Sequence, residues 1–322
     1  MNSIPTLEDI QTAAKRIRGK ALRTPLIYSG ILSEITGWDI YLKPECLQPG
    51  GAFKYRGATN AISLLSKEAR LKGVITASSG NHGIAVALAA ERAGVKAFII
   101  VPEDAPSNKV EIIKNAGARV LRFGENYDDC EGKAEELAGE GYYFLHPFNI
   151  PQVLAGQGTV GLELNEDAPS DLHAVLVPVG GGGLISGVNL GLAHTRPNVD
   201  VIGVEPENCA SFSAAHSAGE LVEIEPKPTC AEGLHTRKIG AIAFQILKDG
   251  PAPVKVTEKA IFAATRFCHE ELKLVVEPSG AAGVAALLSE SYKPAGPTAV
   301  ILSGSNLDRK MLRIVLDVHD RL

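Results

Sequence analysis

The sequence is poor in cysteine, and no two of its cysteines form a C-x-x-C pair. The five cysteines are odd in number and lie far apart along the chain, so we predict neither a disulfide framework nor a structural zinc site, and we expect reduced thiols in the cytoplasm. No apolar run approaches the roughly 18 residues that a membrane-spanning helix requires. The first residues also lack the basic and apolar segments of a secretory signal, so no contact with a membrane is expected.

An excess of positive charge is also missing. The 322 residues carry 32 lysines and arginines against 37 aspartates and glutamates, a formal net charge of −5. A nucleic-acid-binding protein would show a basic patch or stripe, so this function is not expected. The length corresponds to one large domain or two closely joined domains.

Short apolar runs rich in β-branched residues alternate with helical patterns along almost the whole chain. This alternation predicts an α/β fold with parallel sheets covered by helices. Ligands of such folds bind beyond the carboxyl ends of the strands, so the loops that follow strands are the candidates for function. The predicted strands cover residues 39–43, 73–76, 96–101, 119–122, 174–177, 201–204 and 298–302.

Four consecutive glycines, Gly180, Gly181, Gly182 and Gly183, separate a predicted strand from a predicted helix. Bare backbone N–H groups at a helix N-terminus bind phosphate, because the unpaired donors and the helix dipole both favour an anion. A flexible turn is the alternative, but four glycines at this junction cost conformational entropy with no local compensation.

A dinucleotide site is the other phosphate-binding possibility. Counted from Gly181, the G-x-G-x-x-G pattern has Gly183 in place but Ser186 where the third glycine belongs. Glu205 follows about twenty residues later, as a ribose-binding acid would. A nicotinamide-dependent oxidoreductase therefore stays open as an alternative, whereas no P-loop pattern for ATP hydrolysis is present.

Lys54 lies in a second candidate loop, residues 48–57, directly after Phe53 and before a helix predicted over residues 58–66. A lysine in an apolar environment has a lowered pKa and can act as a nucleophile or form an imine with an aldehyde. An ordinary surface lysine is the alternative. The two glycines nearby and the phosphate loop elsewhere favour the functional interpretation.

Hydroxyl, amide and backbone N–H groups gather in two further loops that follow strands. Such groups at a helix start suit a carboxylate or a phenolic oxygen, although a simple helix cap is the alternative in both loops. In the last loop, Ser303 is placed to meet a heterocycle nitrogen. The earlier loop contains Ser78, Ser79, Gly80, Asn81 and His82.

One cofactor accounts for all four loops. Pyridoxal 5′-phosphate needs a lysine for its aldehyde, an anion site for its phosphate, and partners for its ring oxygen and ring nitrogen. We therefore predict that the loops form a single pyridoxal-phosphate site.

The motifs in these loops resemble those of the fold-type II pyridoxal-phosphate enzymes, in the group of serine/threonine dehydratases and serine racemases. The resemblance covers nearly the whole chain and implies a two-domain fold like that of the tryptophan synthase β subunit. Residues 1–72 and 149–322 would form a large domain, and residues 73–148 a smaller, mobile one. The motifs are A-F-K-Y-R-G at 52–57, S-S-G-N-H at 78–82, A-G-Q-G-T at 155–159, G-G-G-G at 180–183, E-P-S-G at 277–280 and S-G-S-N at 303–306.

The resemblance also implies a role for each residue of the site. Lys54 would hold the cofactor covalently and act as the catalytic base, Phe53 would lie against its ring, and Asn81 would meet its phenolic oxygen. The substrate carboxylate would bind to residues 78–82, where Ser79 would be a second acid or base in a racemase. The other cofactor contacts would be Gly180, Gly181, Gly182 and Gly183 at the phosphate and Ser303 at the ring nitrogen.

By the same resemblance, we expect a pyridoxal-phosphate-dependent ammonia-lyase that converts a β-hydroxy-α-amino acid, of the L-threonine or L-serine type, to a 2-oxo acid and ammonia. Serine racemase and 3-hydroxyaspartate dehydratase are the alternatives within the group. The substrate is a small molecule, and a homodimer or homotetramer is expected.

Many members of this group bind Mg²⁺ or Ca²⁺ through a glutamate after a strand and an aspartate six residues later. Glu205 matches the glutamate, but Ser211 stands where the aspartate would be. A hard cation needs several anionic oxygens, so this difference argues against a divalent cation.

Overall fold

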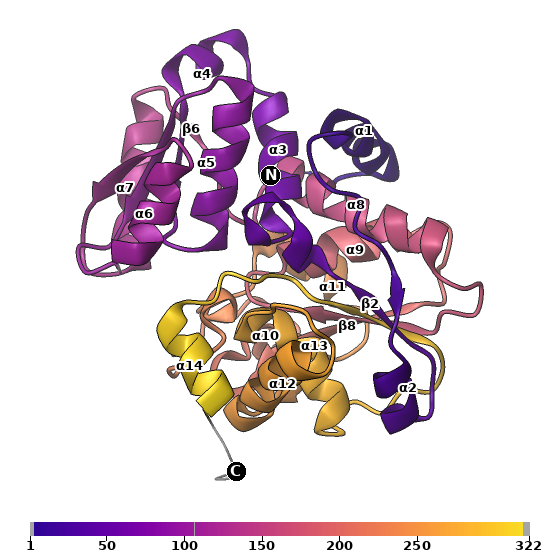
Figure 1. Cartoon of the computed structure of the whole chain (residues 1–322). Coiled ribbons are helices and arrows are strands. Elements are labelled where there is room, and N and C mark those ends of the chain that lie inside the picture. The colour runs from indigo at the N-terminus through magenta and orange to yellow at the C-terminus, as the bar shows by residue number, and fades with distance from the viewer. Residues whose placement is uncertain (1–2, 106, 318–322) are drawn as a thin grey trace.

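The computed structural model describes residues 3–105 and 107–317, and it contains two β-sheets in separate lobes (Figure 1). The strands of the larger sheet are β1 (Ile27–Tyr28), β2 (Ile40–Lys43), β7 (Ala174–Pro178), β8 (Asp200–Pro206), β9 (Val254–Val256) and β10 (Thr298–Ile301). Their order is β1-β2-β10-β7-β8-β9, and all neighbours are parallel except β1 and β2.

The smaller sheet is parallel throughout, in the order β5-β4-β3-β6. Its strands are β3 (Val74–Ala77), β4 (Ala97–Val101), β5 (Arg119–Arg122) and β6 (Tyr143–Phe144). This sheet lies in the upper left of Figure 1 among helices α5 (Asn81–Ala93), α6 (Ser107–Asn115) and α7 (Tyr127–Gly139).

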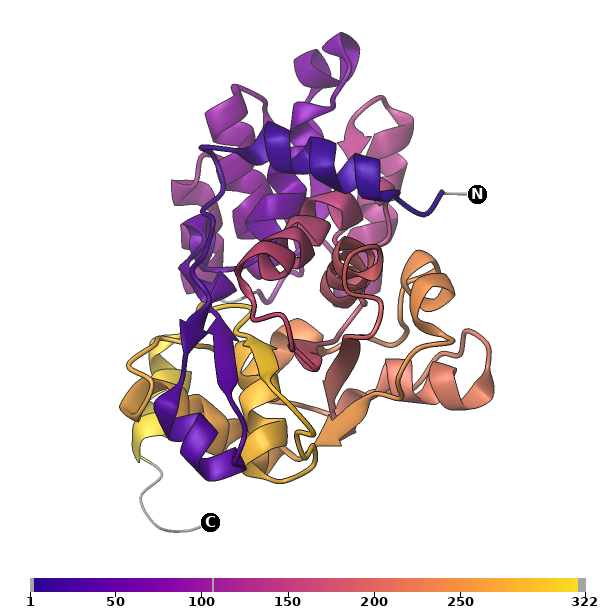
Figure 2. The same ribbon diagram turned by 90° about the vertical axis from the view of Figure 1, so that its right-hand side faces the viewer.

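Most of the remaining helices cover the larger sheet or lie between the two lobes, as the second view shows (Figure 2), whereas α4 (Lys67–Lys72) lies at the top of the smaller lobe (Figure 1). The others are α1 (Leu7–Ile17), α2 (Gly30–Thr36), α3 (Lys54–Ser63), α8 (Pro151–Asp167), α9 (Gly183–Ala193), α10 (Ser211–Ala218), α11 (Ala241–Leu247), α12 (Glu258–Glu270), α13 (Pro278–Leu288) and α14 (Arg309–Asp317). Within the described ranges, no helix has the length and apolar character needed to cross a bilayer.

The predicted α/β fold with parallel sheets is confirmed, and each predicted strand is present within two residues of its expected bounds. The central strands β3, β7 and β10 are buried throughout because both faces of each sheet are covered by helices, whereas the edge strand β5 is partly exposed. One helix differs: α3 begins at Lys54 rather than at residue 58. The reason is a β-bridge between Ala52 and Gly304, which ends the extended segment just before Lys54.

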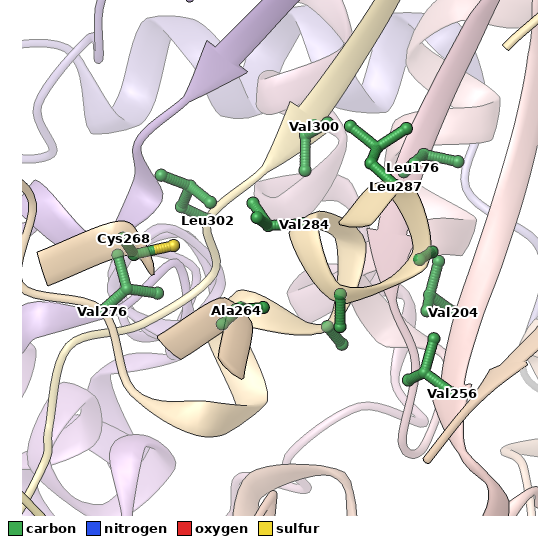
Figure 3. Close-up of a cluster of buried hydrophobic side chains, with 14 of the residues drawn as sticks. Leu176, Val204, Val256, Ala264, Cys268, Val276, Val284, Leu287, Val300 and Leu302 are labelled. Atoms are coloured by element: carbon green, nitrogen blue, oxygen red, sulfur yellow. The ribbon is translucent and has the colours of Figure 1, made fainter. Parts of the chain in front are cut away.

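One core of the larger lobe lies between its sheet and the helices α12 and α13 (Figure 3). A second buried cluster packs the sheet against α8, α9 and α11. Burial of such apolar side chains is the main stabilising contribution to the lobe. The labelled residues of the first cluster are Leu176, Val204, Val256, Ala264, Cys268, Val276, Val284, Leu287, Val300 and Leu302.

The two faces of the smaller sheet have different coverings. Ile75 and Ile100 pack in a cluster with buried residues of α7. The opposite face packs against α5, α6 and α3, with Tyr55 and Ile62 of α3 inside the same cluster as Val74. A helix that the predicted boundary at residue 72 assigns to the large domain thus shares a core with the smaller sheet, and the division into domains stays a prediction.

Glycines allow α3, α8 and α9 to pack with their backbones in contact. A Cβ on Gly156 of α8 would lie 2.6 Å from the Cα of Gly57 in α3, and a Cβ on Gly187 of α9 would lie 2.6 Å from the nitrogen of Gly158 in α8. No larger residue fits at these positions without a shift of the helices. Because Gly57 and Gly187 lie near the first turn of their helices, the starts of α3 and α9 are held beside the same part of α8.

Arg56 is buried in α3 with its guanidinium between two carboxylates. Its Nε and Nη2 donate to the two oxygens of Glu45 at 2.7 and 2.8 Å, and its Nη1 and Nη2 donate to Glu163 at 2.6 and 2.8 Å. Lys43 Nζ donates to Glu163 and to the carbonyl of Thr24, both at 2.7 Å. Two cations therefore balance two anions, and bidentate geometry offsets the cost of burying them.

This network ties β2, α3, α8 and the chain before β1 to one another. Burial acts to raise the pKa of Glu45, but the charge and hydrogen bonds of Arg56 outweigh it and hold that pKa below its usual value. The Glu45 carboxylate is thus kept ionised. Because Arg56 lies two residues after Lys54, its contacts with Glu45 and Glu163 fix the start of α3.

Replacing Arg56 with methionine is expected to lower the free energy of unfolding by about 3–5 kcal/mol, because it leaves buried carboxylates without their partner. Arg23→Met is the matched control: Arg23 also contacts two carboxylates, but its side chain is 52% exposed, so the loss should stay below about 1 kcal/mol. Urea denaturation of the cofactor-free proteins measures both. Equal losses of unfolding free energy in the two variants would show that the buried network stabilises the fold no more than the exposed ion pairs of Arg23 do.

Candidate active site

The loops that follow β2 and β10 are joined by backbone hydrogen bonds. The N–H of Phe53 donates to the carbonyl of Ser303 at 3.1 Å, and the N–H of Ser305 donates to the carbonyl of Gly51 at 2.8 Å. Ser303 itself is 4% exposed. Lys54, the first residue of α3, is therefore held next to the carboxyl end of β10.

Lys54 has a half-buried side chain with an apolar environment. Its Nζ donates to the carbonyl of Pro147 at 2.9 Å and lies 5.2 and 5.9 Å from the ring centroids of Phe53 and Phe148. Burial disfavours the charged ammonium and lowers the pKa of Lys54 to about 8. The amine is thus partly neutral in the range where an ordinary lysine is fully charged.

Phe148 connects Lys54 with the glycine loop. A Cβ on Gly181 would lie 2.4 Å from the Phe148 ring, and a Cβ on Gly183 would lie 2.9 Å from the Cβ of Phe148. The ring of His146 meets Phe148 edge-on at 4.7 Å between centroids. The glycine motif predicts an anion site but does not predict this aromatic residue packed on the loop.

The glycine loop offers buried backbone donors that the chain itself does not use. The residues from Gly180 to Gly183 are all buried, and none of their N–H groups donates to another residue within the described ranges. Gly182 has φ 82°, the left-handed conformation that favours glycine. Buried N–H groups are rarely left without an acceptor, so this turn at the start of α9 is suited to an anion.

A second set of free donors lies at the start of α5. The N–H of Gly80 donates to the hydroxyl of Ser78 at 3.2 Å. The N–H groups of Ser79, Asn81 and His82 make no hydrogen bond to any other described residue. The helix dipole adds to these donors, so a carboxylate is the ligand that this loop suits.

The amide of Asn81 is fixed by two residues from the other lobe. Its Oδ1 accepts from Asn306 Nδ2 at 2.7 Å, and its Nδ2 donates to Glu277 Oε1 at 2.5 Å. These contacts determine which way the amide faces and leave one N–H of Nδ2 free for a ligand. Burial raises the pKa of Glu277 to about 7. The E-P-S-G motif contains Glu277, but sequence reasoning assigned it no role.

The side chain of His82 serves the fold. Its Nε2 lies 2.9 Å from the carbonyl of Leu145, and burial, with the charge of Lys54, lowers its pKa to about 3. Burial and Lys54 likewise lower the pKa of His146 to about 4. Both imidazoles are therefore neutral at physiological pH, so His82 offers a ligand its backbone N–H rather than a charge.

Residues 17–304 match a family model described as "Pyridoxal-phosphate dependent enzyme". The chain belongs to this family. The match sets aside the nicotinamide-dependent oxidoreductase, and it confirms the cofactor predicted from the four loops.

Relatives of this pyridoxal-phosphate enzyme match it along nearly its whole length. An L-threonine ammonia-lyase of Thermotoga maritima is 44% identical over 314 residues, covering 97% of this chain and 78% of that protein. An L-threo-3-hydroxyaspartate ammonia-lyase of Saccharomyces cerevisiae is 39% identical and covers 95% of each chain. The structure of maize serine racemase superposes with a TM-score of 0.92 at 35% identity, covering 98% of each chain.

The residues present fit pyridoxal phosphate. The unused N–H groups between Gly180 and Gly183 suit its phosphate, and Lys54 is an amine with a lowered pKa across Phe148 from them. The free N–H of Asn81 suits the phenolic oxygen.

The residues around Glu205 do not fit a divalent cation. Its Oε1 accepts from the N–H of Phe212 at 2.7 Å, and its Oε2 accepts from the N–H and the hydroxyl of Ser213 at 2.8 and 2.7 Å. Both oxygens thus bind the start of α10, while the Ser211 hydroxyl lies 3.2 Å from that of Thr236. Within residues 3–105 and 107–317, no three His, Cys, Asp or Glu side chains are grouped as metal ligands.

The amine of Lys54 in the cofactor-free protein is expected to react with an acylating reagent with a midpoint near pH 8, against 10.5 for an ordinary lysine. The sign follows from burial, which penalises the charged form and so makes deprotonation easier. Mass spectrometry of the peptide that contains Lys54 measures the rate at each pH. A midpoint near 10.5 would contradict the buried environment.

Proposed function

We propose that this enzyme is an ammonia-lyase that converts L-threonine or L-serine to a 2-oxo acid and ammonia, by loss of the β-hydroxyl as water and hydrolysis of the resulting enamine. The observation that carries the proposal is the position of the Lys54 amine across Phe148 from four buried, unused N–H groups. The choice of reaction is supported by the L-threonine ammonia-lyase of T. maritima, which covers 97% of this chain.

Lys54 is the catalytic base in this proposal. Its lowered pKa gives a larger neutral fraction near pH 7 than an ordinary lysine has, and a neutral amine can take the α-proton of the substrate and later return a proton. When bound, pyridoxal phosphate supplies a ring that withdraws the electron pair left on the α-carbon.

The other residues orient the two ligands. The N–H groups of residues 78–82 bind the substrate carboxylate, and the remaining N–H of Asn81 donates to the phenolic oxygen of the cofactor. Phe53 lies against the cofactor ring, Ser303 meets the ring nitrogen, and residues 180–183 hold the phosphate. The free donors at the starts of α5 and α9 support both anion assignments.

Residues 73–148 act as the mobile part that closes over the substrate. The support is the separate four-stranded sheet, which carries the loop 78–82 at the end of β3. Since α3 shares a core with this sheet, movement of the sheet would also shift the start of α3, where Lys54 lies. Closure excludes water from the site, which strengthens each hydrogen bond to the substrate.

Serine racemase is the second candidate, and the observation that favours it is Ser79. This residue is half-buried in the carboxylate-binding loop, next to Ser78, whose hydroxyl accepts from the N–H of Gly80. A hydroxyl there could return a proton on the face opposite Lys54. The similarity to maize serine racemase agrees with this role.

We also propose a homodimer or homotetramer in the cytoplasm. Apolar side chains are exposed beside β1 and α2, where Tyr28, Ile35 and Trp38 are 54%, 53% and 44% exposed. Apolar groups gathered on one surface favour contact with another protein, here a second copy. The free thiols of all five cysteines agree with a reducing compartment.

Lys54→Ala is expected to lower 2-oxo acid formation by more than about a thousandfold, because it removes the base and the covalent attachment of the cofactor. The assay covers L-threonine, L-serine and 3-hydroxyaspartate, with detection of the 2-oxo acid. Lys67→Ala, at an exposed position in α4, is the control and should keep full activity. Full turnover by Lys54→Ala, or no 2-oxo acid from any of the three substrates with the parent enzyme, would contradict the proposal.

Ser79→Ala is expected to abolish any racemisation of serine while ammonia release falls by less than about tenfold, the effect of one hydrogen bond. Chiral chromatography and 2-oxo acid detection on the same samples separate the two reactions. Ser78→Ala is the control: the Ser78 hydroxyl accepts from Gly80, so its loss should weaken both reactions together. A parallel loss of both in Ser79→Ala would leave that residue as a substrate contact alone.

A further inference from the structure

Gln157, in the A-G-Q-G-T motif, is buried without any hydrogen bond from its side chain. It is 0% exposed, and neither Oε1 nor Nε2 has a partner within residues 3–105 and 107–317. Ser186 of α9 is also 0% exposed, and its hydroxyl is likewise without a partner in that part of the chain. Three unsatisfied polar atoms therefore lie in the interior of the protein.

These atoms lie next to the starts of α3 and α9. The Nε2 of Gln157 is 2.5 Å from the place that a Cβ on Gly57 would take, and its Cβ is 2.9 Å from the place that a Cβ on Gly187 would take. The side chain thus runs from α8 between α3 and α9. Gly57 is three residues after Lys54, and Ser186 is three residues after Gly183.

The direction of these side chains is toward the N-terminal ends of the helices. Side chains on an α-helix lean toward its N-terminus. α8 starts at Pro151, three residues after Phe148, whose ring lies on Gly181. Gln157 therefore leans toward the end of α8 that borders the glycine loop, and Ser186 leans toward the loop from α9.

Leaving these groups unsatisfied is costly. Each buried polar group without a partner costs about 1–3 kcal/mol, whereas a leucine of similar volume would carry no such penalty. Buried polar groups that the chain does not satisfy are usually paired with ordered water or a ligand. The ligand whose site they border is the cofactor phosphate, which accepts hydrogen bonds and orders water around itself.

We propose that Gln157 and Ser186 form the floor of the phosphate site and are hydrogen-bonded, through water that the bound phosphate orders, only in the loaded enzyme. Gln157 is then a positioning residue for the cofactor. The inference rests on the proposed assignment of residues 180–183 to the phosphate, and it does not depend on which amino acid is the substrate.

The test is Gln157→Leu, measured by the melting temperature of the cofactor-free and loaded forms and by the dissociation constant of pyridoxal phosphate. The cofactor-free variant should be at least as stable as the parent, because an unsatisfied amide is removed. The rise in melting temperature on loading should shrink, and the dissociation constant should increase at least about tenfold. The phosphorus NMR signal of the bound phosphate should also shift. Ser186→Ala should act in the same direction.

Ser29→Ala is the matched control. The Ser29 hydroxyl is also buried without a partner in the described ranges, but it lies at the start of α2, away from the four loops. Its replacement should change the melting temperatures of the cofactor-free and loaded forms equally and leave the dissociation constant of pyridoxal phosphate unchanged. If Gln157→Leu did the same, or destabilised the cofactor-free form with no effect on affinity, the inference would be overturned.

Gly181→Ala tests the phosphate assignment of residues 180–183 separately from the role of Gln157. A Cβ there collides with the Phe148 ring, so cofactor affinity should fall. If Gly181→Ala weakened binding and Gln157→Leu did not, only the role of Gln157 would be refuted. If neither changed affinity, the phosphate assignment of residues 180–183 would fail as well.

Discussion

Arg56 lies two residues after Lys54 in α3, and its guanidinium forms ion pairs with the carboxylates of Glu45 and Glu163. Each partner comes from a different element, so the position of α3 is set from two sides at once. A lysine side chain is flexible, so the position of its amine is defined only if the backbone that carries it is fixed. The buried network fixes that backbone without placing any charge next to the Lys54 amine, whose pKa is lowered by burial alone.

The packing of α3 and α9 on α8 has an electrostatic consequence. The starts of α3 and α9 are held beside the same part of α8 through glycines, and each helix start carries roughly half a positive charge. Such a potential stabilises an anion such as a phosphate. The same packing thus favours an anion beside Lys54, while burial alone lowers the pKa of the Lys54 amine.

Sequence patterns were sufficient for seven of the ten described strands and for the candidate loops, because apolar runs and glycine clusters are local signals. They did not predict β1, β6 and β9, which have only two or three residues each. They do not predict α8, since Gly156, Gly158 and Gly161 each cost about 1 kcal/mol in a helix interior relative to alanine. Only contact with α1, α3 and α9 shows why glycine is needed there. Phe148 on the glycine loop and the unsatisfied amide of Gln157 depend on the same long-range packing, which no local pattern contains. The roles of the individual site residues stay predictions for the same reason.

Asn81 and Lys109 of the smaller lobe contact the larger lobe at the site. Asn81 is held by Glu277 and Asn306, and Lys109 of α6 forms an ion pair with Glu232. If residues 73–148 move as proposed, opening breaks these contacts and leaves Glu277 buried without its donor, which is costly for a carboxylate. The Asn81 amide, which we propose meets the phenolic oxygen of the cofactor, is then released in the same step. Closure over the substrate and orientation of the cofactor would thus be a single event, because Asn81 takes part in both.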